Sequence, residues 1–161
     1  MSKTFDVREL LRLAVIDERS GARLYEKLAG GARDAALKGL FADLVQQEHR
    51  HERRFQEMLD NLETPQAFGQ YPDPYVDYLE ALVAEGRSRE QTDAGEQAAA
   101  ASSDRQALDL ALRFEKEQLR LLADVGQVIN PAHKPLVDEV IAEERAHLVQ
   151  LTAARNRPAE S

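Results

Sequence analysis

The sequence contains no cysteine and no tryptophan among its 161 residues. Without cysteine it can form no disulfide and can offer no thiolate to a metal. No apolar run reaches the roughly 20 residues of a transmembrane helix, and the N-terminus lacks the apolar segment of a signal peptide. We therefore expect a soluble, cytoplasmic protein with no membrane partner.

Strand-forming residues and positive charge are also scarce. Aromatic residues make up 6% of the chain, and long β-branched runs are missing. Asp and Glu (29) outnumber Lys and Arg (21), and the net charge of −8 argues against a nucleic-acid partner. The abundant residue types favour helices. The composition and length together predict one all-α domain that spans residues 1–161.

Apolar residues recur every three or four positions in four segments, which indicates amphipathic helices. The predicted helices cover about residues 6–29, 34–62, 104–125 and 135–154. Asp6 is expected to cap the first helix and Ser103 the third, and Pro135 suits the first position of the fourth. The pattern predicts an antiparallel four-helix bundle.

Residues 63–103, between the second and third helices, are interpreted as a long crossover. Residues 66–74 are rich in Pro, Gly and Tyr and are expected to be irregular. A short amphipathic helix is expected over 75–85, where its apolar side either covers the bundle or meets a partner subunit. The exposed tyrosines of this crossover favour a homodimer.

One acid interrupts the apolar stripe of each helix, and in the second and fourth helices a histidine follows three residues later on the same face. These six residues are Glu18, Glu48, His51, Glu115, Glu144 and His147. A carboxylate is almost never buried without a partner. Glu18 and Glu48 are about as far apart as Glu115 and Glu144, so all six side chains can converge near the bundle centre.

This residue set is the one that holds two metal ions in a four-helix bundle: a Glu from each of two helices and Glu-x-x-His from each of the others. Carboxylates bridge and neutralise cations, and imidazole favours iron over calcium or magnesium, with manganese or zinc as substitutes. The alternative is that the acids pair with arginine or face water, but no Lys or Arg lies on the stripes.

Three further residues lie close to the six in the sequence. Tyr25, two turns after Glu18, either donates to a ligand carboxylate or carries an electron, or is an ordinary core residue. Asp17 and Glu143 lie off the apolar stripes and are expected to be solvated charges.

The strings at residues 14–25, 48–51, 107–116 and 143–148 resemble those of the rubrerythrin-like branch of the ferritin-like di-iron superfamily. The resemblance covers about residues 6–62 and 104–152. It implies a ferritin-like fold and a di-iron site, with the six residues as iron ligands and peroxide or dioxygen as the oxidant. It also implies a separate electron donor, because the cysteine-ligated domain of many rubrerythrins is missing.

The chain also departs from that family. Gln118 stands where rubrerythrins carry an additional glutamate, so the set resembles the six-ligand site of bacterioferritins. The first hypothesis is an oxidoreductase that reduces peroxide or dioxygen. The second is a non-enzymatic iron-binding or iron-delivery protein with slow ferroxidase activity, and the third is a bundle that keeps the site for stability alone.

Overall fold

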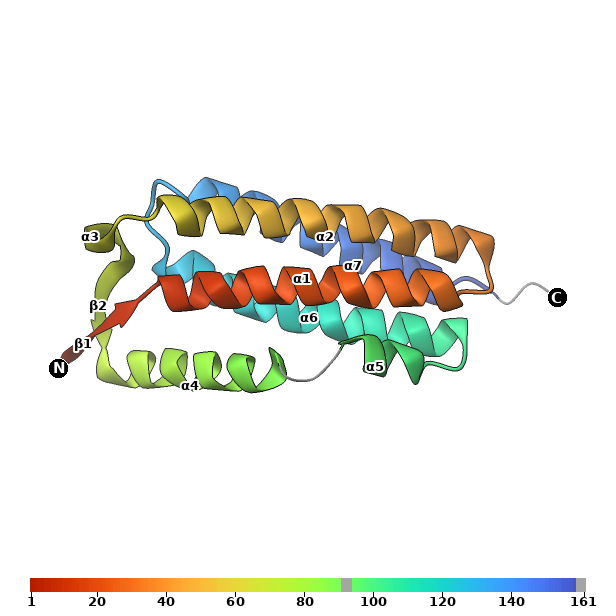
Figure 1. The fold of residues 1–161 in the computed structure, drawn as a ribbon, viewed down its shortest axis with the longest axis horizontal. Coiled ribbons are helices and arrows are strands. Elements are labelled where there is room, and N and C mark those ends of the chain that lie inside the picture. Colours follow the sequence, from red (N-terminus) through yellow and green to blue (C-terminus); the bar gives the residue numbers. More distant parts are fainter. Residues whose placement is uncertain (91–93, 159–161) are drawn as a thin grey trace.

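A computed structural model describes residues 1–90 and 94–158 and shows a bundle of four long helices (Figure 1). These helices are α1 (Arg8–Gly31), α2 (Ala35–Asn61), α6 (Asp104–Val128) and α7 (Lys134–Arg155). Consecutive helices pack in pairs, α1 with α2 and α6 with α7. The predicted all-α, ferritin-like bundle is confirmed.

Side chains cap the starts of α2 and α6, close to where the sequence predicts that these helices begin. The Asp34 carboxylate accepts a hydrogen bond from the Leu37 backbone N–H at the start of α2. The Ser103 hydroxyl accepts one from the Gln106 N–H at the start of α6, as predicted. Each cap satisfies a backbone donor that the first turn of a helix leaves free.

A strand that the sequence analysis did not predict precedes the first helix. Strand β1 (Ser2–Asp6) pairs in antiparallel register with β2 (Phe68–Pro72), and Phe5 lies opposite Gly69. Helix α1 begins at Arg8, and the Asp6 carboxylate accepts a hydrogen bond from the Arg8 backbone N–H at 3.0 Å, in keeping with the predicted cap. The same carboxylate also forms an ion pair with the Arg8 side chain. Residues 68–72 are consequently a strand and not irregular.

The crossover between α2 and α6 covers one side of the bundle. After β2 it continues as α4 (Asp73–Glu90), longer than predicted, and it also contains α3 (Thr64–Ala67) and α5 (Ala94–Ala99). Both α4 and α5 pack against α1 (Figure 1). Gly86 lies so close to Leu13 that a Cβ there would be only 2.5 Å from the leucine side chain. The apolar side of α4 thus covers the bundle, one of the two possibilities that the sequence left open.

The apolar core consists of two clusters along the bundle. One contains Leu11 and Val15 of α1 together with Phe55 of α2. The other contains Leu24 of α1 and Phe41 of α2. Between the two clusters the buried residues are Glu18, Gly21 and Ala22 in α1 and the polar pair Glu48 and His51 in α2.

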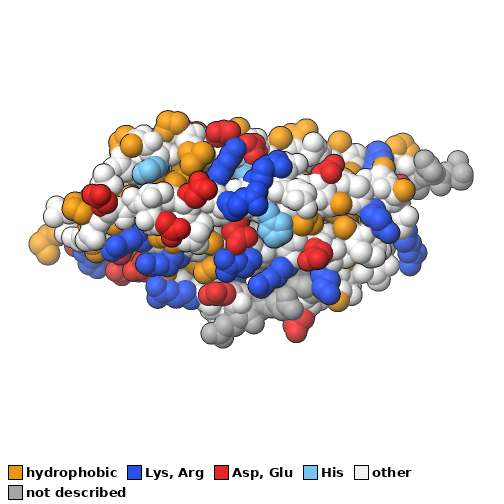
Figure 2. Space-filling view, turned by 45° about the horizontal axis from the view of Figure 1, so that its top comes forward, with side chains coloured by type: hydrophobic (Ala, Val, Ile, Leu, Met, Phe, Trp, Pro, Cys, Tyr) orange, Lys and Arg blue, Asp and Glu red, His pale blue; other side chains and the backbone are white. Residues whose placement is uncertain are grey.

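The outer surface carries both signs of charge. Figure 2 shows acidic and basic side chains interspersed over one face of the molecule. Within residues 1–90 and 94–158, no helix combines the length and the apolar character needed to cross a membrane.

Candidate metal centre

The six predicted residues meet between the two apolar clusters, each at most 1% exposed. They form two overlapping groups, in each of which one nitrogen or oxygen per residue lies within 4.8 Å of all the others. The first group is Glu18, Glu48, His51 and Glu144, and the second is Glu48, Glu115, Glu144 and His147. Glu48 and Glu144 belong to both groups, so they occupy the middle of the centre.

Helical spacing brings these side chains inward. On α2, Glu48 and His51 lie in the buried stripe, between Leu44 on one side and Phe55 on the other. Residues three and four apart share a helix face, so the polar pair must enter the interior together with its apolar neighbours. The packing of the flanking apolar residues therefore forces two ionisable groups into the core.

Several carboxylate oxygens of the centre have no hydrogen-bond partner in the described part of the chain that could offset their burial. Both side-chain oxygens of Glu18, Oε1 of Glu48 and Oε2 of Glu115 accept no hydrogen bond within the described part of the chain. A buried carboxylate without a partner costs several kcal/mol of folding free energy. Cations placed among these oxygens would remove that cost, and the donor set of oxygens and imidazole nitrogens suits iron. The residues present thus fit two metal ions.

Both histidines direct Nδ1 toward the carboxylates. Nδ1 of His51 lies 2.6 Å from Oε1 of Glu144, and Nδ1 of His147 lies 2.8 Å from Oε2 of the same carboxylate. The two rings are stacked with centroids 5.8 Å apart. In the structure Glu144 therefore bridges the two imidazoles, and each Nδ1 is oriented toward the interior of the centre.

The outer nitrogens of the two histidines have partners from the opposite helix. Nε2 of His51 lies 2.6 Å from Oε2 of Glu143, and Nε2 of His147 lies 2.5 Å from Oε1 of Gln47. Such partners fix the tautomer and the ring orientation of a histidine ligand. With a proton on each Nε2, both Nδ1 atoms would be able to bind a metal in place of their contacts with Glu144.

Glu143 is thus not a solvated charge, as the sequence suggested, but a half-buried partner of His51 that also forms an ion pair with Arg54. The contact made by Gln47 was missed altogether. Both residues immediately precede the glutamate of a Glu-x-x-His string. This shared position is the sequence signal that could have identified them.

Two further buried residues donate to the carboxylates. The Tyr25 hydroxyl donates a hydrogen bond to Oε1 of Glu115, and Gln118 Nε2 donates one to Oε2 of Glu48 at 3.0 Å. Tyr25 is fully buried, and burial raises the pKa of its hydroxyl well above the usual range, so it remains a donor. Of the roles considered for Tyr25, the structure shows the hydrogen bond to a carboxylate.

Burial controls the protonation of the centre. It raises the pKa of Glu18 and Glu48 well above the usual range, with the neighbouring acids adding to the shift, and it raises the pKa of Glu115 to about 7. Burial also opposes ionisation of Glu144, but hydrogen bonds from the two histidines outweigh it and lower the pKa of this residue to about 2. Without metal, the centre therefore retains protons on some acids at neutral pH.

Gly21 of α1 permits the close approach of Glu48. A Cβ at this position would clash with Glu48 Oε2 and lie 2.9 Å from Cε1 of Phe114. The missing side chain leaves the space that the carboxylate occupies.

Comparison with known proteins agrees with this geometry. A model of the rubrerythrin family matches residues 9–154. A solved structure from Thermotoga maritima, assigned to the ferritin-like diiron-carboxylate proteins, superposes with a TM-score of 0.72 at 20% identity and covers 95% of this chain and 96% of its own. At this identity the likeness shows the fold alone. No curated protein matches the chain.

Proposed function

Because the chain belongs to the rubrerythrin family, we propose that its centre binds two iron ions and reduces peroxide or dioxygen with electrons from a separate donor. The observation that supports this most is the set of four buried carboxylate oxygens of the centre that accept no hydrogen bond from residues 1–90 or 94–158. A bundle without metal ions would gain stability by replacing these acids with apolar residues.

The two groups of side chains assign the ligands. Glu18 and His51 would hold one ion, and Glu115 and His147 the other. Glu48 and Glu144, which belong to both groups, would lie between the ions. Four carboxylates balance two divalent cations, so the loaded centre carries no uncompensated buried charge.

When bound in the ferrous state, the two irons supply two electrons. Hydrogen peroxide takes two electrons and two protons and yields two water molecules; dioxygen with the same electrons and protons yields peroxide. The protein surrounds this chemistry with apolar side chains, and Tyr25 steadies Glu115 by a hydrogen bond that needs no water. Manganese or zinc would occupy the same donors as substitutes.

A second candidate is a non-enzymatic iron-binding or iron-delivery protein with slow ferroxidase activity. It is favoured by Gln118, whose neutral amide lies beside Glu48 where rubrerythrins carry an additional glutamate. An amide offers no further charge for a ferric ion. Under this reading iron leaves the centre after oxidation, whereas an enzyme keeps it through many cycles.

Metal analysis of Glu48→Gln tests the proposal, with Glu57→Gln, an exposed acid on the same helix, as the control. The parent and the control should bind about two irons per chain, and Glu48→Gln should bind fewer. An unchanged iron content of Glu48→Gln, or a parent protein that takes up no Fe(II), would overturn it.

Anaerobic addition of peroxide then separates the two candidates. An enzyme consumes many equivalents of peroxide when a chemical reductant is present and retains its iron. A delivery protein consumes about one equivalent per iron pair and releases ferric iron. The homodimer and the cytoplasmic location expected from the sequence stay predictions.

A further inference from the structure

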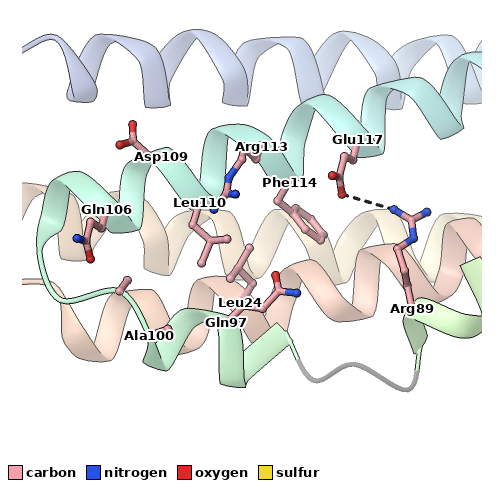
Figure 3. Close-up of a pocket in the computed structure, with 11 residues that line it drawn as sticks. Leu24, Arg89, Gln97, Ala100, Gln106, Asp109, Leu110, Arg113, Phe114 and Glu117 are labelled. Atoms are coloured by element: carbon pink, nitrogen blue, oxygen red, sulfur yellow. Dashed lines mark hydrogen bonds and ion pairs between the residues drawn. The ribbon is translucent and has the colours of Figure 1, made fainter.

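Two adjoining cavities lie beside the centre, on the side formed by α1 and α6. The larger, about 730 Å³, is bounded by α1, α5, α6 and the end of α4 (Figure 3). The smaller has a volume of about 120 Å³, which is space for a few water molecules. The cavities share four lining residues, Arg89, Gln97, Phe114 and Glu117.

The smaller cavity ends at residues that contact the metal centre. Gln118 lines it, is 2% exposed and donates to Oε2 of Glu48, while its own Oε1 has no hydrogen-bond partner in the described chain. Phe114 also lines the smaller cavity. Its ring lies against Gly21, next to the Glu48 carboxylate. A single layer of side chains therefore separates this cavity from Glu48.

Among the charged residues that line the smaller cavity, acids outnumber bases. It contains Asp17, Glu90 and Glu117 but a single base, Arg89. The guanidinium of Arg89 lies 3.5 Å from the Glu117 carboxylate, in an exposed ion pair that Figure 3 shows at the cavity wall. A cavity with low-dielectric walls and excess negative charge concentrates cations. A neutral oxidant such as peroxide would gain nothing from this charge.

The opposite side of the centre offers a less open path. There the outer nitrogens of the two histidines are covered by Glu143 and Gln47, at 2.6 and 2.5 Å. An ion that entered on that side would have to break these contacts and rotate a ligand. On the side of α1 and α6, the side-chain oxygen of Gln118 accepts no hydrogen bond from any described residue.

We propose that Fe(II) reaches the metal centre through these two cavities, guided by the acidic residues of the smaller one and passed to Glu48 by the side chain of Gln118. Glu117 is then a guiding residue and not a metal ligand, and its ion pair with Arg89 marks the passage between the cavities. This inference rests on the proposed function, because it requires a centre that binds metal.

Loading kinetics of a charge-reversal variant test the route. Glu117→Lys changes the charge at the passage, and Glu57→Lys changes the net charge equally on an exposed part of α2. Co(II), which needs no oxidant, is mixed with each metal-free protein, and binding is followed by its visible absorption. Glu117→Lys should load about tenfold more slowly at low salt, since electrostatic steering changes association rates by 10-fold or more. The deficit should shrink as salt is added, and Glu57→Lys should load like the parent.

A second variant tests the same route by its shape. Ala100 is exposed and lines the larger cavity (Figure 3), so Ala100→Trp should fill part of this space and slow loading, with little change in the equilibrium affinity for Co(II). A thermal melt of each variant establishes that it is folded.

The outcomes are distinct. If Glu117→Lys loads at the parent rate, or binds Co(II) more weakly without loading more slowly, the route is wrong although the metal centre stands. If Co(II) loading is unchanged while the reaction with peroxide slows, the cavities serve the oxidant, and the inference for Fe(II) is overturned. If the parent protein binds no metal, the proposed function itself has failed.

Discussion

Replacing Gly21 by alanine tests whether a missing side chain shapes the metal centre. Gly21 lies within α1, where an alanine would ordinarily stabilise the helix by about 0.8–1.0 kcal/mol. Its new Cβ, however, would clash with Oε2 of the fully buried Glu48 and crowd Phe114. Overpacking of this kind costs about 1–3 kcal/mol. The net change should therefore lie between about zero and a loss of roughly 2 kcal/mol.

Gly39 provides the matched control. It lies in α2 and is exposed, and a Cβ there would meet no atom within 4 Å. Gly39→Ala should therefore gain about 0.4–1 kcal/mol, which raises the melting temperature by roughly 2–4 °C per kcal/mol for a chain of this size. The two substitutions differ only in what the added methyl group meets.

Thermal melts with and without metal measure both effects. A ligand that binds only the folded state stabilises the protein, and the stabilisation grows with the logarithm of the ligand's affinity. Gly21→Ala displaces Glu48, so metal should raise its melting temperature less than it raises that of the parent and of Gly39→Ala. If Gly21→Ala gains as much stability as Gly39→Ala and shows the same response to metal, the close approach of helix and carboxylate has no bearing on the centre.

Two changes of conditions and two other substitutions give further predictions. The fold raises the pKa of Glu18 and Glu48, so these residues do not lower the stability of the metal-free protein below about pH 4.5, where they are protonated in the unfolded chain too. As the pH rises above this value, the metal-free protein should lose stability. Thermal melts between about pH 5 and 9 should show this fall, and bound metal should abolish it. Metal loading should release protons at pH 6, because Glu115, with a pKa of about 7, is still largely protonated at that pH in the metal-free protein. A pH indicator in weak buffer detects the release. Loading without release of protons would contradict the raised pKa values. Tyr25→Phe leaves a buried carboxylate oxygen without its donor and should cost about 1–3 kcal/mol of unfolding free energy in denaturant melts of the metal-free protein. Glu143→Gln removes the charge of a histidine partner and should weaken metal binding by roughly tenfold in titrations, whereas an unchanged affinity would make this contact incidental.

The parts of this protein that follow helical periodicity could be predicted from its sequence. The six residues that converge all lie on apolar stripes, and the two Glu-x-x-His strings occupy equivalent places in the two halves of the chain. Because the apolar side chains of each stripe are buried, polar side chains on the same stripe must also face the bundle interior. The fold class and the convergence of the six side chains therefore required no information from distant residues.

The parts that depend on contacts between distant segments were missed. Strand β1 has no periodic signal of its own and exists because residues 68–72 pair with it. Glu143 and Gln47 lie off the apolar stripes, so helical periodicity did not identify them. Their contacts follow from how α2 and α7 face each other. Residues 91–93 of the predicted crossover lie outside the part that the structure describes.

The pairing of β1 with β2 also constrains the order in which the chain can assemble during translation. Thr4 lies opposite Gln70, and the whole α1–α2 hairpin lies between them in the chain. β1 therefore cannot pair until this hairpin has been synthesised and β2 has left the ribosome. At about 5–20 residues per second this interval lasts roughly 3–13 s. During it the edge of β1 is open to any other extended chain nearby. A bulky fusion placed directly before Ser2 would therefore interfere with the pairing of the two strands, whereas α6 and α7, which are synthesised after β2, do not depend on this pairing for their own hydrogen bonds.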